Sequence, residues 1–415
     1  MEKLTGALVF AQSGGPTSVI NSSACGVFET ALKQGEITRV LGAHHGIKGV
    51  LNDDLYDIGQ ESREELALLK TTPSSALGSV RYKLADPAVD DTDYRRILEV
   101  FKKHNVRYFL YNGGNDSMDT CYKVGKFLTE NNYPCRVIGV PKTIDNDLEF
   151  TDHCPGFASA AKYIATSCME LTLDGKVYDK GSILIVEIMG RHAGWLTAAS
   201  YVATAKGLGP DLIYVPERNF DVDRFVEEVK RVYAETGNCF VAISEGIHDE
   251  NGKFISDYAK VVEDKKDMFN HTQLGGACAY LANIVKAKTG AKVRAIEFSL
   301  LQRCAAHCGS STDVEEAYLA GKSAVLAAVE GKSGVMMAFK RSVVDGKYIC
   351  SIDEVDLSRV ANYEKKLPDE YITADGNNIT PAFLDYVLPL IKGESRPPFV
   401  DGVPCFANLK KVKAD

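Results

Sequence analysis

Residues 140–147, Val140-Pro141-Lys142-Thr143-Ile144-Asp145-Asn146-Asp147, place two carboxylates, an amide, a hydroxyl and an ammonium group directly after an apolar run. That run, Cys135 to Val140, is short and predicts a buried β-strand. In an open α/β sheet, ligands bind in the crevice beyond the carboxyl ends of the strands. We therefore expect Lys142 to Asp147 to line a ligand-binding cleft. The alternative is a polar turn that only reverses the chain, since Pro, Asn and Asp are common turn residues.

The length of the chain predicts two domains. With 415 residues it exceeds the size at which a single hydrophobic core usually stops growing, so we expect two domains that share one cleft. The composition, 45% hydrophobic and 25% charged residues, argues against disorder, and no apolar run is long enough to span a bilayer. The first residues lack the basic and then apolar plan of a signal peptide, so we expect a cytoplasmic protein.

Cysteine content and charge exclude other classes of function. Eleven cysteines in such a chain predict buried or unreactive thiols rather than a disulfide framework. Cys304, His307 and Cys308 lie close together, but no second ligand pair at zinc spacing follows them, which favours a structural role over a metal site. A net charge of -8 without a concentrated basic tract argues against nucleic acid as a partner. Small anionic substrates remain compatible with this charge, because they respond to the local field.

The first glycine loop follows a predicted strand. Gly6 to Ala11 is an apolar run that leads through Gln12 to Ser18 into an amphipathic helix. Glycine lets the backbone approach a phosphate, and the free N–H groups of a helix N-terminus face the anion. The loop has neither a Walker A pattern nor a full Gly-x-Gly-x-x-Gly fingerprint, so a phosphate cradle and a packing turn are equally open.

A second glycine loop carries an acidic residue. The strand predicted from Val106 to Tyr111 leads into residues 112–119, where paired glycines again precede a helix. The carboxylate of Asp116 in the first turn would repel a phosphate unless a cation lies between them. Magnesium is the natural bridge, because it favours oxygen ligands and substrate phosphates. The alternative is that Asn115, Asp116 or Ser117 simply caps the helix.

Two arginines follow glycine-containing or strand-ending segments. Arg81 lies in a loop beside Gly78 and Ser79, where its fork would suit a phosphate, although a lone loop arginine is usually solvated. Arg191 follows the strand predicted over 182–189 and is well placed to span two anionic substrates. His192 is a candidate base, but a hydrogen-bonded structural role is favoured because Asp145 already fills that position.

The remaining elements are predicted from apolar periodicity. Helices are expected over 61–70, 93–103, 157–169 and 314–330, and a long helix is expected from His271. Strands are expected over 37–42, 211–215, 239–244, 292–299 and 335–340, the last returning to the first domain. A terminal helix is expected after Thr380 as N-cap, with Pro381 at the first helical position.

Four of these motifs occur together in the phosphofructokinases. Gly14-Gly15, Gly113 to Ser117, Pro141 to Asp147 and Met189 to Arg191 fall in the order and rough spacing of that family, and the resemblance covers nearly the whole chain. The chain most closely resembles the pyrophosphate-dependent branch, because the ATP-dependent branch typically has glycine at the two positions that are Asp116 and Lys142 here.

The resemblance implies an α/β fold of two Rossmann-like lobes with a shared active-site cleft. Residues 1–155 and 303–355 would form a donor-binding lobe, and residues 156–302 and 356–415 a sugar-phosphate-binding lobe. The implied reaction transfers a phosphoryl group from pyrophosphate to the C1 hydroxyl of fructose 6-phosphate, giving fructose 1,6-bisphosphate and phosphate in a reversible step of glycolysis. Magnesium is the implied cofactor, and a homodimer or homotetramer the implied assembly.

The resemblance also assigns roles to residues of the cleft. Asp145 is the implied general base, and the other implied catalytic residues are Lys142, Asp116 and Arg191. Pyrophosphate is expected at Gly15, Arg81, Gly114 and Lys142. Magnesium is expected at Asn115 and Asp116, with Asp147 helping to organise it, although the family usually has a carboxylate where Asn115 stands. The sugar phosphate is expected at Thr143, Ile144, Asp145, Asp147, Met189, Gly190, Arg191, Glu245, Arg294, Leu300 and Arg303.

The chain departs from the family pattern around the 6-phosphate of the sugar. The family holds this phosphate with arginines that align with Arg294 and Arg303, but its usual histidine or tyrosine appears as Leu300. The glycines after the second arginine appear as Cys304-Ala305, and a further arginine of the ATP-dependent enzymes aligns with Ser182. The phosphate clamp is therefore the part of the site that the resemblance defines least.

Two other functions stay open at this stage. One is an ATP-dependent phosphofructokinase with unusual donor residues, and the other is a non-catalytic regulatory subunit that binds sugar phosphates. The set Asp145, Lys142 and Arg191 argues against the regulatory subunit, because a chain freed of catalysis has no reason to keep a base.

Overall fold

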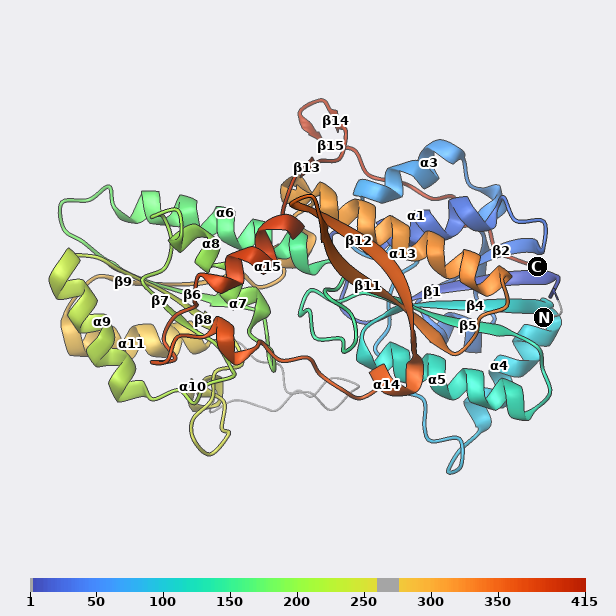
Figure 1. The fold of residues 1–415 in the computed structure, drawn as a ribbon, viewed down its shortest axis with the longest axis horizontal. Helices are drawn as coiled ribbons and strands as arrows, with labels where there is room; N and C mark the ends of the chain where they lie inside the picture. The colour runs from blue at the N-terminus through green and yellow to red at the C-terminus, as the bar shows by residue number, and fades with distance from the viewer. Residues whose placement is uncertain (1–2, 260–275) are drawn as a thin grey trace.

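The computed structural model describes residues 3–259 and 276–415, which fold into two α/β lobes placed end to end (Figure 1). The first lobe is built on a seven-stranded sheet in the order β12-β11-β5-β4-β1-β2-β3. Its strands are β1 (Gly6–Gln12), β2 (Ile37–Ala43), β3 (Leu55–Asp57), β4 (Val106–Gly113), β5 (Arg136–Pro141), β11 (Val335–Val344) and β12 (Lys347–Asp356). The edge strands β3 and β12 are antiparallel to their neighbours, and the strands between them are parallel.

Helices cover both faces of the first sheet. They are α1 (Ile20–Ala31), α2 (Ile47–Leu51), α3 (Arg63–Leu68), α4 (Thr92–Lys103), α5 (Asn115–Glu130), α13 (Ser311–Val329) and α14 (Leu357–Val360), with 3-10 turns at Ile58–Gln60 and Leu69–Thr71. Alternation along β1 divides its side chains between two cores. Val9 packs in the core under α4 and α5, while Leu8 and Phe10 pack under α1 and α13. A strand buried on both faces appears in the sequence as a continuous apolar run.

The second lobe contains a smaller, wholly parallel sheet in the order β7-β8-β6-β9. Its strands are β6 (Ile183–Ile188), β7 (Leu212–Tyr214), β8 (Cys239–Ser244) and β9 (Val293–Glu297). Its helices are α6 (Phe157–Gly175), α7 (Trp195–Ala199), α8 (Tyr201–Thr204), α9 (Val222–Thr236), α10 (Ile255–Ala259), α11 (Ala277–Thr289), α12 (Leu301–Cys304) and α15 (Ala382–Leu390), with 3-10 turns at Ala306–Cys308 and Asp369–Tyr371. One core lies between this sheet and α6, α7 and α15, and the other lies under α9 and α11.

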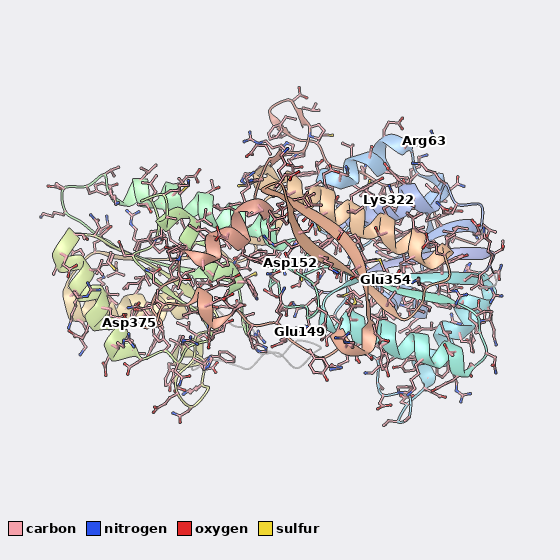
Figure 2. All side chains as sticks on the ribbon, viewed as in Figure 1. Arg63, Glu149, Asp152, Lys322, Glu354 and Asp375 are labelled. Carbon is pink, nitrogen blue, oxygen red and sulfur yellow. The ribbon has the colours of Figure 1, made fainter. Side chains whose placement is uncertain are left out.

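The chain crosses between the lobes more than once. Asp152 lies where the two lobes meet (Figure 2), and the chain returns through α13 to the β11–β12 hairpin of the first sheet. Two short antiparallel pairs follow, β10 (Gly309–Ser310) with β13 (Glu394–Ser395) and β14 (Phe399–Val400) with β15 (Val403–Pro404).

The end of the chain returns to the first lobe, so that both termini lie at the same end of the molecule (Figure 1). The backbone N–H of Ala414 donates to the carbonyl of Leu55 over 2.8 Å, and that of Ala407 donates to Thr72 Oγ1 over 2.9 Å. This differs from the expectation that all of residues 356–415 belong to the second lobe. The reason is that an extended tail can follow the surface of either lobe without a pattern of its own.

Most of the predicted elements are confirmed, and the differences have local causes. The helix over 61–70 begins after Ser62, which caps it, and ends in a 3-10 turn. The strand over 335–340 extends to Val344 because it pairs with β12, which the sequence analysis does not predict. The prediction that Thr380 caps the terminal helix is wrong, because its hydroxyl donates instead to the carbonyl of Glu370 over 2.7 Å. The predicted start of a helix at His271 lies outside the described residues, and α11 is described from Ala277.

Among the described residues, no helix combines the length and the apolar character that crossing a bilayer would require.

Helices α1 and α13 pack closely because each has a glycine at the contact. A methyl group on Gly26 would lie 2.1 Å from the carbonyl oxygen of Tyr318, and one on Gly321 would lie 2.0 Å from that of Ser23. Any side chain at these positions would push the helices apart.

We therefore predict that Gly26→Ala lowers the free energy of unfolding by ~1–3 kcal/mol, the usual cost of overpacking a core. Denaturant unfolding monitored by circular dichroism would measure the change. Gly175→Ala at the end of α6 is the matched control, because no atom lies within 4 Å of the added methyl group. Equal stability of the two variants would contradict this account of the contact between α1 and α13.

Candidate active site

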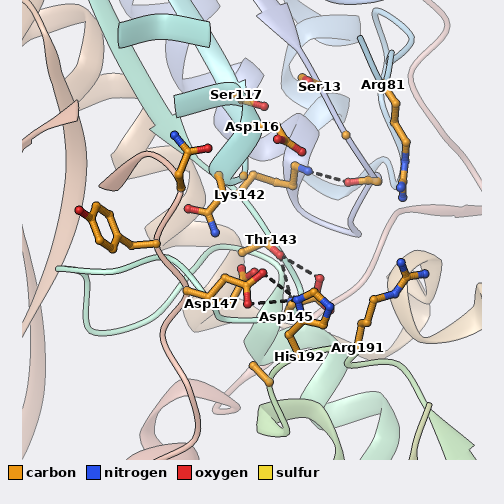
Figure 3. Close-up of a pocket in the computed structure, with 18 of the residues that line it drawn as sticks. Ser13, Arg81, Asp116, Ser117, Lys142, Thr143, Asp145, Asp147, Arg191 and His192 are labelled. Carbon is orange, nitrogen blue, oxygen red and sulfur yellow. Dashed lines mark hydrogen bonds and ion pairs between the residues drawn. The ribbon is translucent and has the colours of Figure 1, made fainter. Parts of the chain in front are cut away.

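A cavity of about 620 Å³ lies at the carboxyl ends of β1, β4 and β5, where the first lobe faces the second (Figure 3). Because the carboxyl ends of parallel strands lie along one edge of a sheet, loops that are far apart in the sequence meet here. The first lobe contributes Ser13 to Gly15, Arg81, Gly114 to Ser117, Lys142, Thr143, Asp145 and Asp147. The second lobe contributes Arg191 to Ala193 and Glu245, and a later segment contributes Asn362 to Glu364.

Lys142 joins the two glycine loops of the first lobe. Its side chain is almost fully buried, and its ammonium group donates to the carbonyl of Gly15 over 2.7 Å. Its backbone N–H donates to the carbonyl of Gly113 over 3.0 Å. Burial lowers the pKa of Lys142 to about 8, although Asp145 opposes the shift. An anion bound beside this ammonium group would stabilise its charged form.

Asp145 and Asp147 project from the turn that follows β5. Asp145 is held by Thr143, whose hydroxyl accepts from the Asp145 N–H over 3.1 Å and lies 3.5 Å from its carboxylate. Burial raises the pKa of Asp145, whereas Lys142 lowers it. Burial also raises the pKa of Asp147, and the negative charge of Asp145 raises it further. The segment is a turn, as the simpler interpretation expected, but it is a turn whose two carboxylates face the cleft.

The loop after β1 keeps its backbone next to positive side chains. Gly14 has φ +74, in the left-handed region that favours glycine, and a methyl group there would lie 3.1 Å from the ammonium of Lys142. A methyl group on Gly15 would lie 3.0 Å from the guanidinium of Arg303 and 4.0 Å from that of Arg81. Both glycines therefore leave room for an anion between the backbone and these cations.

The N-terminus of α5 faces the cleft without a side-chain cap. Its N-cap residue is Gly114, and no side chain forms a capping hydrogen bond there, so the alternative that Asn115, Asp116 or Ser117 caps the helix is wrong. Asn115 Oδ1 is buried and has no hydrogen-bond partner among the described residues, and Asp116 lies 3.9 Å from Lys83 Nζ. An orphaned amide oxygen beside a carboxylate fits the oxygen ligands that Mg²⁺ prefers.

The second lobe presents Glu245 and the residues after β6. Gly190 has φ +136, and its N–H donates to Glu245 Oε1 over 3.4 Å, which brings the ends of β6 and β8 together. Burial raises the pKa of Glu245 to about 7, and Asp145 adds to the shift. The backbone N–H of Met189 donates to Gln302 Oε1 over 3.3 Å, so the segment that carries Arg303 is tied to the same edge.

Not all of the predicted sugar-binding residues face this cleft. Arg294 lies on the edge strand β9, 3.8 Å from Asp174, and lines a separate small cavity with Ser182. Leu300 is exposed at 54% and does not line the cleft, and Ile144 packs in the core of the second lobe. Arg303 is closer to the cleft, since its guanidinium lies beside Gly15.

The cleft also contains residues that no sequence pattern predicts. Asn362, Tyr363 and Glu364 form part of a segment that crosses from the first lobe to the second. Glu364 accepts a hydrogen bond from His192 Nδ1 over 2.9 Å, and this bond lowers the pKa of Glu364 to about 2. His192 thus has the hydrogen-bonded role expected of it. No local pattern marks residues 362–364, because they contact residues far away in the sequence.

Comparisons with known proteins agree with this geometry. The family model described as Phosphofructokinase matches residues 7–297. A pyrophosphate–fructose 6-phosphate 1-phosphotransferase of Halomonas elongata is 43% identical over 410 residues, covering 98% of this chain and 96% of the relative. An enzyme of the same name from Xanthomonas campestris pv. campestris is 45% identical over 414 residues, covering 98% of this chain and 97% of the relative.

A solved structure extends the likeness to the whole fold. The crystal structure of a pyrophosphate-dependent phosphofructokinase from Nitrosospira multiformis matches with a TM-score of 0.89 at 41% identity, covering 99% of this chain and 98% of that one. With a family model that matches residues 7–297 and relatives that match from end to end, the chain belongs to the phosphofructokinase family.

Proposed function

We propose that this protein is a pyrophosphate-dependent phosphofructokinase, which transfers a phosphoryl group from pyrophosphate to the C1 hydroxyl of fructose 6-phosphate. The products are fructose 1,6-bisphosphate and phosphate, and the reaction is a reversible step of glycolysis. The observation that carries the proposal is that Asp116 and Lys142 lie in the same cleft as Asp145. The end-to-end match to enzymes named for this reaction supports it.

Asp145 is the general base in this mechanism. The C1 oxygen attacks the phosphorus, its proton passes to the carboxylate of Asp145, and the bond to the bridging oxygen of pyrophosphate breaks to release phosphate. Burial raises the pKa of Asp145, which makes its carboxylate a better proton acceptor, and the positive charge of Lys142 opposes this shift. Proton transfer of this kind typically contributes about 10²–10⁴-fold to the rate.

Positive groups stabilise the rest of the transition state. Lys142 and Arg191 line the cleft on opposite lobes, so together they can spread the charge of the transferred phosphoryl group. Gly15, Arg81 and Gly114 hold the pyrophosphate. Asn115 Oδ1 and Asp116 would hold Mg²⁺, with Asp147 helping to orient it, and the ion would neutralise part of the pyrophosphate charge.

The sugar phosphate is held mainly by the second lobe. Glu245 accepts hydrogen bonds from sugar hydroxyls, and Thr143, Met189 and Gly190 position the sugar through groups at the edge of the cleft. Ile144 contributes only its backbone, since its side chain is in the core. Arg303 binds the 6-phosphate.

Arg294 lies on the exposed edge strand β9 and does not line the cleft of its own chain, so in this proposal it binds the 6-phosphate in the cleft of another copy. This position supports the homodimer or homotetramer that the family resemblance implies. Leu300 is exposed and follows β9 in the chain, so we propose that it too contacts the sugar phosphate of another copy. We also propose that the protein is cytoplasmic.

The role of Asp145 makes a direct prediction. Asp145→Asn should lower kcat at least about a hundredfold, because the amide cannot accept the hydroxyl proton. Binding of fructose 6-phosphate, measured by calorimetry, should stay nearly unchanged. Asp345→Asn is the control, since Asp345 is an exposed turn residue with φ 50 that asparagine also adopts. Turnover of Asp145→Asn within a few-fold of the control would rule out this base.

The lowered pKa of Lys142 predicts a limit at alkaline pH. Lys142 loses its proton as pH rises through about 8, so kcat/KM for pyrophosphate should fall above that pH. In Lys142→Arg the remaining activity should no longer fall there, because arginine stays protonated. A pH profile of kcat/KM for both proteins makes the comparison. A flat wild-type profile through pH 8 and beyond would contradict the prediction.

The donor is chosen by Asp116 and Lys142 together. In this proposal the carboxylate of Asp116 lies where the α-phosphate of ATP would bind. Two negative charges about 4 Å apart repel each other by about 4 kcal/mol at an effective dielectric of about 20. We expect strong activity with pyrophosphate and almost none with ATP. Replacing both residues by glycine should reduce pyrophosphate use and allow weak use of ATP, with non-additive single changes. An assay with each donor tests this, and a wild-type preference for ATP would overturn the donor assignment.

A further inference from the structure

Asn146 separates the two carboxylates of the catalytic turn. It has φ +58, in the left-handed region that asparagine adopts more readily than most residues, and its side chain is fully buried. A left-handed residue between Asp145 and Asp147 sets the directions in which the chain enters and leaves the turn. Asn146 itself does not line the cleft.

Both ends of the Asn146 amide are bonded. Its Oδ1 accepts from the backbone N–H of Cys154 over 2.9 Å, which closes the loop of the turn. Its Nδ2 donates to the hydroxyl oxygen of Tyr386 over 2.7 Å. The same hydroxyl donates to the carbonyl of Asp152 over 2.9 Å. Tyr386 on α15 thus connects the middle of the turn to a later part of the same loop.

Tyr386 is itself fixed from several sides. Arg341 of β11 donates to the carbonyl of Tyr386 over 3.0 Å, and its guanidinium lies 4.8 Å from the centre of the Tyr386 ring. The same guanidinium pairs with Asp152 over 3.0 Å. The ring of Trp195 lies 5.0 Å away. These contacts hold the backbone and the ring of Tyr386 beside the loop that carries Asp152.

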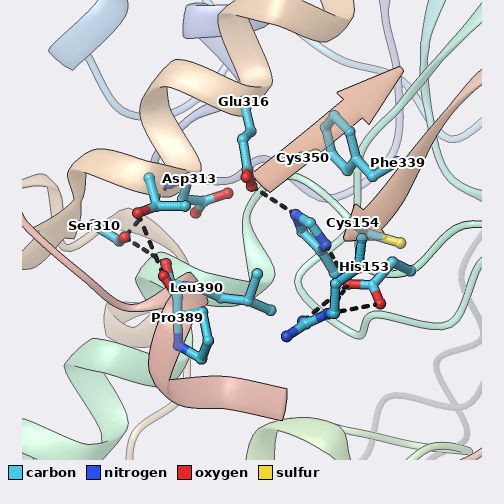
Figure 4. Close-up of polar contacts among 12 residues, drawn as sticks. His153, Cys154, Ser310, Asp313, Glu316, Phe339, Cys350, Pro389 and Leu390 are labelled. Atoms are coloured by element: carbon cyan, nitrogen blue, oxygen red, sulfur yellow. Dashed lines mark hydrogen bonds and ion pairs between the residues drawn. The ribbon is translucent and has the colours of Figure 1, made fainter. Parts of the chain in front are cut away.

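The network continues into the first lobe. Figure 4 shows His153 between the loop and α13, with its Nε2 2.7 Å from Glu316 and its Nδ1 2.8 Å from Asp152. Glu316 also accepts from the hydroxyl of Tyr348 over 2.8 Å. Residues 145–154 are therefore held by side chains of α13, the β11–β12 hairpin and α15.

From these contacts we infer that Asn146 and Tyr386 are positioning residues for the general base, which act by fixing the turn that carries Asp145. The inference rests on the proposed function, in which Asp145 accepts the C1 proton. Neither residue lines the cleft, so their effect is expected on the geometry of proton transfer and not on binding. A displacement of about 1 Å at a reacting group can cost about a hundredfold in rate.

Tyr386→Phe tests the inference with little change in packing. The ring remains, and the carbonyl of Asp152 still accepts a hydrogen bond from Lys365 Nζ over 2.9 Å. The main change is therefore that the Nδ2 of Asn146 loses its hydrogen-bond acceptor. We expect kcat to fall roughly tenfold or more, while KM for fructose 6-phosphate stays within about twofold of wild type. A kcat within about twofold of wild type would overturn the inference.

Tyr133→Phe is the matched control. Tyr133 is also buried, and its hydroxyl donates to the carbonyls of Phe101 and Val106, far from the cleft. Both variants should lower Tm, but only Tyr386→Phe should lower kcat. An equal fall of kcat in both variants would mean that a general loss of stability is responsible, and would overturn the inference.

Asn146→Gly is a second test of the same inference, which can be used even if Tyr386→Phe does not fold. Glycine accepts φ +58 without strain, so this variant removes the amide and leaves the backbone conformation available. Its kcat should fall at least as far as that of Tyr386→Phe. In the double variant the loss should equal that of Asn146→Gly alone, because the bond to Tyr386 is already absent. Independent, multiplied losses, or an Asn146→Gly enzyme with wild-type kcat, would overturn the inference.

Asp145→Asn measured beside these variants separates two kinds of failure. If Asp145→Asn stays active, the base assignment fails and the positioning inference fails with it. If Asp145→Asn is inactive while Tyr386→Phe and Asn146→Gly keep wild-type kcat, only the positioning inference fails.

Discussion

The cleft depends on one buried cation, the ammonium group of Lys142. A buried charge is unfavourable unless hydrogen bonds and opposite charges replace the lost water, and Lys142 has one carbonyl, that of Gly15, and the carboxylates of its own turn. Burial shifts the pKa values of Lys142, Asp145 and Asp147 toward their neutral forms. A phosphate beside the ammonium and a divalent cation beside the carboxylates would each favour the charged forms.

The same arrangement explains how far the sequence predicts the fold and the site. Strands buried on both faces, such as β1, β4 and β5, appear as apolar runs that periodicity detects. The rule that ligands bind at the carboxyl ends of such strands is then enough to assign Asp116, Lys142 and Asp145 to one cleft. These predictions succeed because they depend on short segments, each of which carries its own pattern of burial and turn residues.

The features that sequence patterns do not predict depend on distant contacts. β12 is an edge strand in which exposed and half-buried residues alternate, so its sequence lacks an apolar run. Glu364 reaches the cleft only because its segment bonds to both lobes, through Lys365 N–H to Asp147 and Trp195 Nε1 to Lys365. The family resemblance identifies Arg294 as a residue that binds the 6-phosphate. It does not show that Arg294 lies on an edge strand, away from the cleft of its own chain. For β12, Glu364 and Arg294, the position in the fold rather than the residue type decides whether the residues are buried or reach the cleft.

The turn that carries Asp145 and Asp147 belongs to the segment that joins the two lobes. Further along this segment, α6 begins the second lobe with Gly156 as its N-cap residue. The N–H groups of Gly156 and Ser159 both donate over 2.9 Å to the buried carboxylate of Asp313 on α13. A negative side chain at a helix N-terminus is favourable, and here it comes from a helix that packs against the first sheet. The start of the second lobe is thus fixed by a residue of α13, in the same segment of chain that carries Asp145. A change in the relation of the lobes would act on this connection, so the contacts that join the lobes also bear on the direction of the Asp145 carboxylate.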